Sequence, residues 1–96
     1  MRAAGKMTAL AALFPSLRDA PGLSPWDPRR LDAWATVAPN EAARHAARFV
    51  LGVFDDCEPW ACGRFDVLRA VRAWDDEHRR AFAGWAILPW FAVDDT

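Results

Sequence analysis

Two cysteines and two histidines carry the side chains best suited to metal or nucleophilic chemistry. Cys57 and Cys62 are separated by four residues, and His45 and His78 lie in other parts of the chain. Zinc sites with four protein ligands usually combine a closer cysteine pair with a local histidine pair. Each histidine here precedes a phenylalanine by four residues, which is typical of an imidazole at the edge of a core. We therefore expect no metal site and no cofactor.

Motifs for catalysis are weak in this chain. The sequence contains no glycine-rich phosphate loop, no Gly-x-Ser-x-Gly turn and no His-Glu-x-x-His helix. A Cys–His pair is the remaining nucleophile, and nothing in the spacing places either histidine near either cysteine. The acidic run 75–77 suits a helix start, where carboxylates oppose the positive end of the helix dipole. We therefore expect a non-catalytic protein.

The composition is that of one small globular domain. Of the 96 residues 53% are hydrophobic and 26% are charged, and 12 basic against 13 acidic side chains leave a formal net charge of −1. This balance argues against a protein that mainly coats nucleic-acid backbones. No apolar run reaches the ~20 residues that cross a bilayer, and two cysteines are too few for a disulfide framework. We expect one domain over residues 1–96, in the cytoplasm, with no membrane contact.

Helix signals dominate the sequence and strand signals are nearly absent. Asp27-Pro28 and Asn40 are typical helix starts, and Thr8 can cap a short first helix. At Asp75 a break or sharp kink is favoured over one continuous helix. Residues 1–7 are expected to be a flexible or non-native start. The expected fold class is all-α, a small bundle of four or five short helices.

Two Pro-Trp pairs 34 residues apart suggest a degenerate duplication. Pro25-Trp26 opens a first unit over residues 25–54, and Pro59-Trp60 opens a second over residues 59–88. In so biased a composition the matching residues can also arise by chance. A true duplication predicts two α-hairpins packed face to face. The second hairpin would then break near Asp75, as the first is forced to break at Pro39.

The expected core follows from apolar residues at helical spacing. The chain has six tryptophans, and each buried one removes roughly 200 Å² of surface from water. These rings compensate for alanine-rich helices that offer little side-chain volume. The core members we expect are Leu31, Trp34, Phe49, Val53, Leu68, Val71, Trp74, Phe82 and Trp85.

The carboxyl-terminal segment is the candidate partner-binding surface. Residues 85–93 are almost wholly apolar, and Pro89 prevents a helix from continuing cleanly through them. Trp90 and Phe91 are neighbours, so in an extended chain their rings point to opposite sides. We expect one ring to cover the bundle, while the other, with Val93, contacts a protein partner or a second copy. The expected function is a non-catalytic adaptor or accessory subunit.

The alternative function is nucleic-acid binding or regulation through a helix-turn-helix-like unit over residues 64–88. Its contacts would come from four arginines, Arg44, Arg48, Arg79 and Arg80. Arg44 and Arg48 are four residues apart and share one helical face. The acidic residues 75–77, which lie shortly before Arg79 and Arg80, would repel the phosphates. Nucleic-acid binding is therefore the second hypothesis.

Overall fold

The structure, a computed structural model, describes residues 2–95 and is all-α, as the sequence predicts. Its five α-helices are α1 (Arg2–Ala12), α2 (Pro28–Val37), α3 (Glu41–Phe54), α4 (Val67–Ala73) and α5 (Asp76–Ile87). Two short 3₁₀ helices are η1 (Pro15–Leu17) and η2 (Ala92–Asp95). Among the described residues, no helix is long and apolar enough to cross a membrane.

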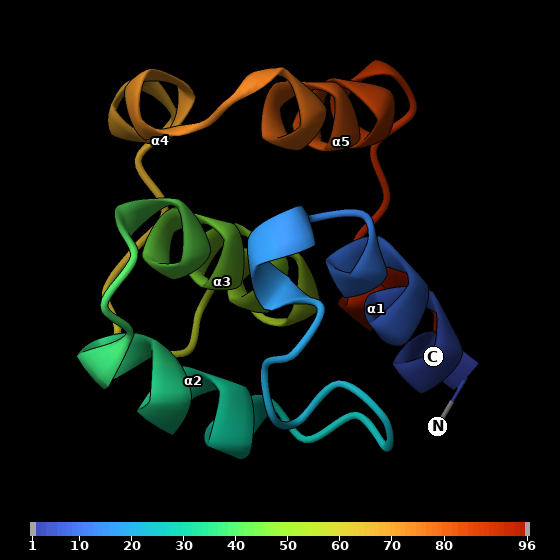
Figure 1. Cartoon of the computed structure of the whole chain (residues 1–96). Coiled ribbons are helices and arrows are strands. Elements are labelled where there is room, and N and C mark those ends of the chain that lie inside the picture. Colours follow the sequence, from blue (N-terminus) through green and yellow to red (C-terminus); the bar gives the residue numbers. More distant parts are fainter. Residues whose placement is uncertain (1, 96) are drawn as a thin grey trace.

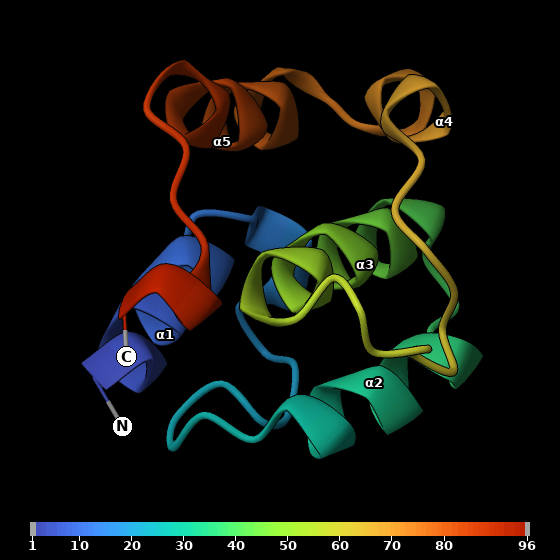
Figure 2. The same ribbon diagram turned by 180° about the vertical axis from the view of Figure 1, so that it is seen from behind.

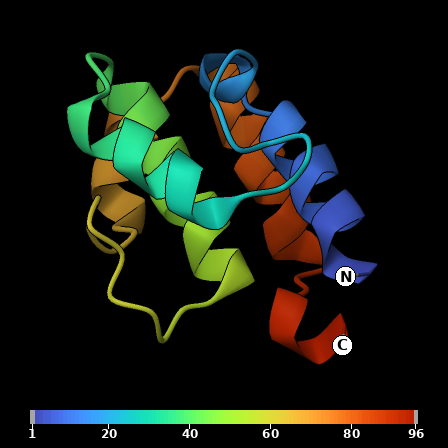
Figure 3. The same cartoon turned by 90° about the horizontal axis from the view of Figure 1, so that it is seen from below.

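Helix α3 lies at the centre of the molecule and packs against α1, α2, α4 and η1. Figure 1 shows α4 and α5 as one layer above α3 and α1, with α2 on the opposite side of α3. Seen from behind in Figure 2, η2 lies beside α1, so the carboxyl-terminal segment folds back over the first helix. Figure 3 shows the long loop between α3 and α4 extending from one end of the bundle.

Side-chain caps decide where four of the helices begin. Asp27, Asn40, Asp66 and Asp75 each accept a hydrogen bond from the backbone N–H three residues later. These bonds satisfy donors that have no partner within the helix. Asp75 follows the end of α4 and opens α5, so the predicted break is confirmed.

The first helix begins earlier than the sequence predicts. It starts at Arg2, so Thr8 lies inside it and is not an N-cap. The Thr8 hydroxyl donates instead to the carbonyl oxygen of Leu23. Residues 2–7, expected to be a flexible start, are helical, and Met7 is fully buried. The apolar stripe of this helix, and not a capping residue, therefore holds it against the bundle.

The helices do not repeat at the interval of the two Pro-Trp pairs. An offset of 34 residues places the counterpart of Pro28 at Cys62, but α4 begins at Val67. Asp32 lies inside α2 and is buried, whereas its counterpart Asp66 is the exposed N-cap of α4. The first helices of the two segments therefore start at different positions relative to their Pro-Trp pairs.

Eight of the nine expected core residues are buried or partly buried, namely Leu31, Trp34, Phe49, Val53, Val71, Trp74, Phe82 and Trp85. Leu68 is the exception, with 74% of its surface exposed. Ala70 is the inward residue of α4, and Leu68 lies two residues earlier, about 200° around the helix. The segment from α1 to η1 adds large buried side chains that were not expected in the core, among them Met7, Leu10, Phe14 and Leu17.

Candidate functional site

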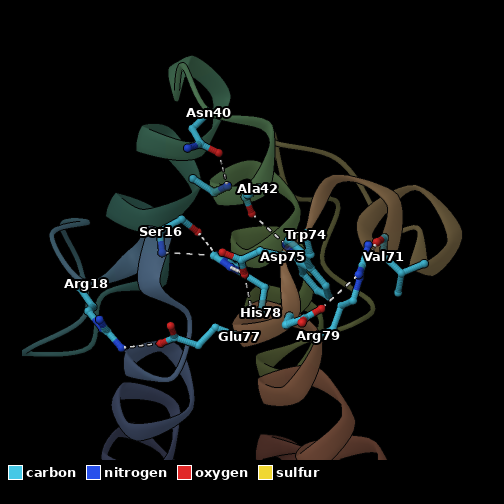
Figure 4. Close-up of polar contacts among 12 residues, drawn as sticks. Ser16, Arg18, Asn40, Ala42, Val71, Trp74, Asp75, Glu77, His78 and Arg79 are labelled. Carbon is cyan, nitrogen blue, oxygen red and sulfur yellow. Dashed lines mark hydrogen bonds and ion pairs between the residues drawn. The ribbon is translucent and has the colours of Figure 1, made fainter.

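A chain of three polar side chains links η1 to the start of α5 (Figure 4). The hydroxyl oxygen of Ser16 lies 2.7 Å from Nε2 of His78, and Nδ1 of His78 lies 2.7 Å from Oδ1 of Asp75. Hydrogen bonds from the backbone and side chain of His78 hold the pKa of Asp75 below its ordinary value. A carboxylate at this position requires a proton on Nδ1, so Nε2 accepts the Ser16 hydroxyl proton. The order of donors and acceptors in these hydrogen bonds is that of a Ser–His–Asp triad.

Aromatic rings enclose the imidazole of His78, which is only 4% exposed. The ring stacks on Trp74 with centroids 6.1 Å apart, and Phe14 lies 5.9 Å away. The expected place of this histidine at the edge of the core is therefore confirmed. Ser16 was not expected as the partner of this histidine, because no spacing rule links η1 to α5.

The backbone N–H groups next to Ser16 are already engaged. An oxyanion hole needs free donors, but the Ser16 N–H points at Nε2 of His78 at 3.4 Å and the Leu17 N–H donates to the carbonyl of Phe14 at 2.9 Å. Five well-formed cavities in the described part of the chain are lined by other residues. The arrangement joins η1 to the start of α5 by hydrogen bonds.

An open cavity of about 410 Å³, here called the aromatic groove, lies between α3, α5 and the loop that follows α3. Six aromatic rings line it, those of Phe49, Trp60, Phe65, Phe82, Trp85 and Phe91. Its charged lining residues are Arg48, Asp56, Glu58 and Arg64. Apolar pockets of about 300–1,000 Å³ with a few polar groups are typical binding sites.

The tail residues expected to contact a partner lie in different surroundings. Trp90 is half-buried, and the ammonium group of Lys6 lies 4.7 Å from its ring centroid. Phe91 is 37% exposed, meets the ring of Trp85 edge-on at 5.5 Å and lines the aromatic groove. Val93 is exposed beside a smaller cavity. The structure thus brings Phe91, but not Trp90, into the groove.

A second cavity, of about 480 Å³ and here called the basic cleft, lies between α3 and α4. Four arginines line it, Arg44, Arg48, Arg69 and Arg72, together with Glu41 and His45. Arg44 and Arg48 were expected to act together. Arg69 and Arg72 come from α4, and the sequence did not predict that α4 would lie beside them. The other two arginines of the nucleic-acid hypothesis, Arg79 and Arg80, do not line the cleft.

The cysteines and histidines considered as metal ligands are not brought together. Among the described residues, the ligand atoms that lie within 4.8 Å of one another belong to Asp55, Asp56 and Cys57, all exposed. His45 lines the basic cleft, and His78 bonds to Ser16.

The other cysteine, Cys62, belongs to a buried structural contact. Its N–H and that of Ala61 donate to the carboxylate of Asp32, each at 2.9 Å. Burial opposes ionisation of Asp32, but these hydrogen bonds outweigh it and leave its pKa below the ordinary value. Burial and the neighbouring carboxylate raise the pKa of the Cys62 thiol to about 12. This thiol therefore stays protonated and is a poor nucleophile.

Comparison of the chain with protein-family models, curated proteins and solved structures returned no match. Its function is therefore inferred from the aromatic groove, the basic cleft and the Ser16–His78–Asp75 chain.

Proposed function

We propose that the protein is a non-catalytic adaptor or accessory subunit that binds a partner protein in the aromatic groove. The observation that carries the proposal is the groove itself, a cavity of about 410 Å³ lined by six aromatic rings. Pockets lined by aromatic side chains are typical of the hot spots of protein interfaces. Exposed apolar patches on a monomer usually mark an interaction site.

The occupant we propose is a segment of the partner with an aromatic or aliphatic anchor beside a basic residue. Asp56 lines one edge of the groove, and Asp55 lies next to it around an adjoining cavity. Asp94 lies beside them around a smaller cavity of about 300 Å³ that Phe91 also lines. Negative charge therefore borders the end of the groove at Phe91, whereas Arg48 and Arg64 line other parts of it. A cationic flank on the partner complements that acidic end.

Site-specific crosslinking tests this proposal. A photoreactive phenylalanine analogue at position 91 should crosslink the partner, which is then identified and purified for binding titrations. Val67, an exposed valine at the start of α4, also lines the groove. Phe91→Ala and Val67→Ser should each weaken that binding by about tenfold. Val37→Ser is the matched control, because Val37 is also an exposed helical valine but lies at the end of α2, outside the groove.

Two outcomes would contradict the proposed occupant. Binding that is unchanged in both groove variants would exclude the groove as the contact surface. The second outcome is self-association through the groove, which light scattering during size-exclusion chromatography measures. A dimer that dissociates in Phe91→Ala and persists in Val37→Ser would assign the groove to a second copy of this chain.

The Ser16–His78–Asp75 chain favours a second candidate function, acyl transfer at Ser16. The Ser16 hydroxyl oxygen would attack a carbonyl carbon while His78 takes its proton and returns it to the leaving group. The occupied backbone donors and the absence of Ser16 from the five cavities argue against it. A fluorophosphonate probe, which labels activated serines, decides between the non-catalytic function and acyl transfer. Labelling of Ser16 that is lost in His78→Gln would overturn the non-catalytic proposal.

Nucleic-acid binding through Arg44, Arg48, Arg79 and Arg80 has less support than partner binding. Arg79 donates to the carbonyl of Val71 at 2.9 Å and lies 3.5 Å from Asp76, so its charge is partly engaged. We place the proposed interaction in the cytoplasm, because both cysteines are free thiols and such thiols are typical of reducing compartments.

A further inference from the structure

The basic cleft concentrates positive charge in a chain whose net charge is −1. Its lining holds four guanidinium groups and one carboxylate, that of Glu41. Asp66 pairs with Arg69 at 3.7 Å, and counting it still leaves an excess of two positive charges. Like charges crowded around one cavity repel each other, and a bound anion relieves that repulsion.

Two of the arginines are prepared for a ligand in different ways. Nε of Arg48 donates to the carbonyl oxygen of Cys62 at 2.6 Å, so this side chain is held in place before any ligand arrives. A group that is ordered in advance loses less entropy on binding. Arg72 makes no hydrogen bond or ion pair with another described residue, so its donors remain available.

His45 lines the cleft and carries a buried polar atom that has no hydrogen-bond partner. The side chain is 6% exposed, and its Nδ1 atom is buried without a hydrogen-bond partner. Burial and then the charge of Arg48 lower its pKa, and Arg44 acts in the same direction, while Glu41 and Asp66 oppose them. An oxyanion in the cleft would favour the protonated imidazole, which donates from both nitrogens.

We propose that the basic cleft binds a phosphate group carried by a small molecule, such as a phosphate monoester or a pyrophosphate. Guanidinium groups donate paired hydrogen bonds that match phosphate oxygens. An excess of two positive charges suits a multiply charged anion better than a single carboxylate. A nucleic-acid strand needs a longer row of basic residues than this cleft offers. The residues that line the cleft all belong to α3 and α4, and Arg79 and Arg80 are not among them.

Calorimetric titration of the full chain with inorganic pyrophosphate tests the site. Arg44→Gln and Arg72→Gln should each weaken binding by about tenfold, the effect of losing one charged hydrogen bond. Arg80→Gln is the matched control, since it removes the same charge from an exposed site outside the cleft and should change the affinity less than about twofold. Thermal melts without ligand show that each variant is folded.

A second measurement locates the anion. The His45 imidazole signals should titrate at higher pH when pyrophosphate is present, and this shift should be smaller in Arg72→Gln. Phe91→Ala, in the aromatic groove, should bind pyrophosphate like the parent, so failure of the partner proposal would not affect this one.

Three results would overturn the phosphate site. The first is the absence of binding at millimolar pyrophosphate. The second is an equal loss of affinity in Arg72→Gln and Arg80→Gln, which would indicate unspecific charge attraction. The third is tighter binding of a single-stranded or duplex oligonucleotide that Arg80→Gln also weakens, which would assign the arginines to nucleic acid.

Discussion

Ser16 and His78 are 62 residues apart in the chain, yet the hydroxyl oxygen of one lies 2.7 Å from Nε2 of the other. Helix α5 otherwise packs on α3 through its rings, as Phe82 and Trp85 each meet Phe49 edge-on. The first turn of α5 is therefore held by the Ser16–His78 bond, by the rings around His78 and by the ion pair of Glu77 with Arg18 at 3.0 Å, while ring contacts hold the turns that follow. Loss of the Ser16–His78 bond should loosen the start of α5 before the rest of the helix.

Replacing Ser16 with alanine should lower the free energy of unfolding by about 1 kcal/mol, because one hydrogen bond between η1 and α5 is lost. Asp75→Ala should destabilise the protein more than Asp66→Ala. Both residues are N-caps, but Asp75 also bonds to the imidazole of His78. Urea unfolding followed by tryptophan fluorescence measures the difference. Equal effects of the two aspartate variants would show that the imidazole bond contributes nothing to stability.

The packing of α4 is tested by one buried and one exposed side chain. Trp74→Ala should cost about 3–5 kcal/mol, since the ring is buried and its Nε1 donates to the carbonyl oxygen of Ala42 at 3.1 Å. Leu68→Ala should change stability by less than about 0.5 kcal/mol, because Leu68 faces solvent. Thermal denaturation compares the two. A large loss in Leu68→Ala with a small one in Trp74→Ala would contradict the observed face of α4.

His45 should make stability fall at mildly acidic pH. Burial and the charge of Arg48 lower its pKa below 6.5 in the folded protein. The unfolded chain then binds a proton more readily, so this contribution is fully present above about pH 6.5 and is lost as the pH falls through the folded-state pKa. Urea midpoints measured from about pH 7 down to about pH 5 should decline.

The matched variant for this pH effect is His45→Gln, which cannot titrate and should remove the decline. The pKa values of the carboxyls of Asp32 and Asp75 lie below the ordinary value of 3.8, so they affect stability only at lower pH. An identical decline in His45→Gln would assign the acid sensitivity to other groups.

The two cysteines should differ in their reaction with iodoacetamide. Cys57 is exposed, although the charge of Asp56 raises its pKa and slows its reaction. Cys62 is buried, and its pKa of about 12 leaves almost no thiolate. Mass spectrometry of the folded protein should find label on Cys57 first, and on Cys62 only after unfolding. Labelling of Cys62 as fast as Cys57 would contradict its buried position beside Asp32.

The candidate sites were only partly predictable. Arg44 and Arg48 share a face of one helix, and local spacing is enough to show that. Their partners Arg69 and Arg72 come from another helix, and no pattern in the sequence states which helices face each other. The aromatic groove is formed by rings from four segments of the chain. The sequence shows that aromatic residues are abundant, but it does not show which rings lie together. The alternation of Trp90 and Phe91 predicted that their rings would lie in different surroundings, but not that Phe91 would be the exposed one.

The sequence by itself determined the all-α class and most helix starts, because capping residues and prolines act on the backbone within a few residues. It also determined the break at Asp75, where the cap lies in the chain next to the helix that it opens. Only the tertiary structure decided that α1 begins near residue 2 and that Leu68 faces solvent. It also decided that Ser16 meets His78. These outcomes depend on which distant surfaces bury one another, and such burial outweighs the small local preferences that a sequence pattern records.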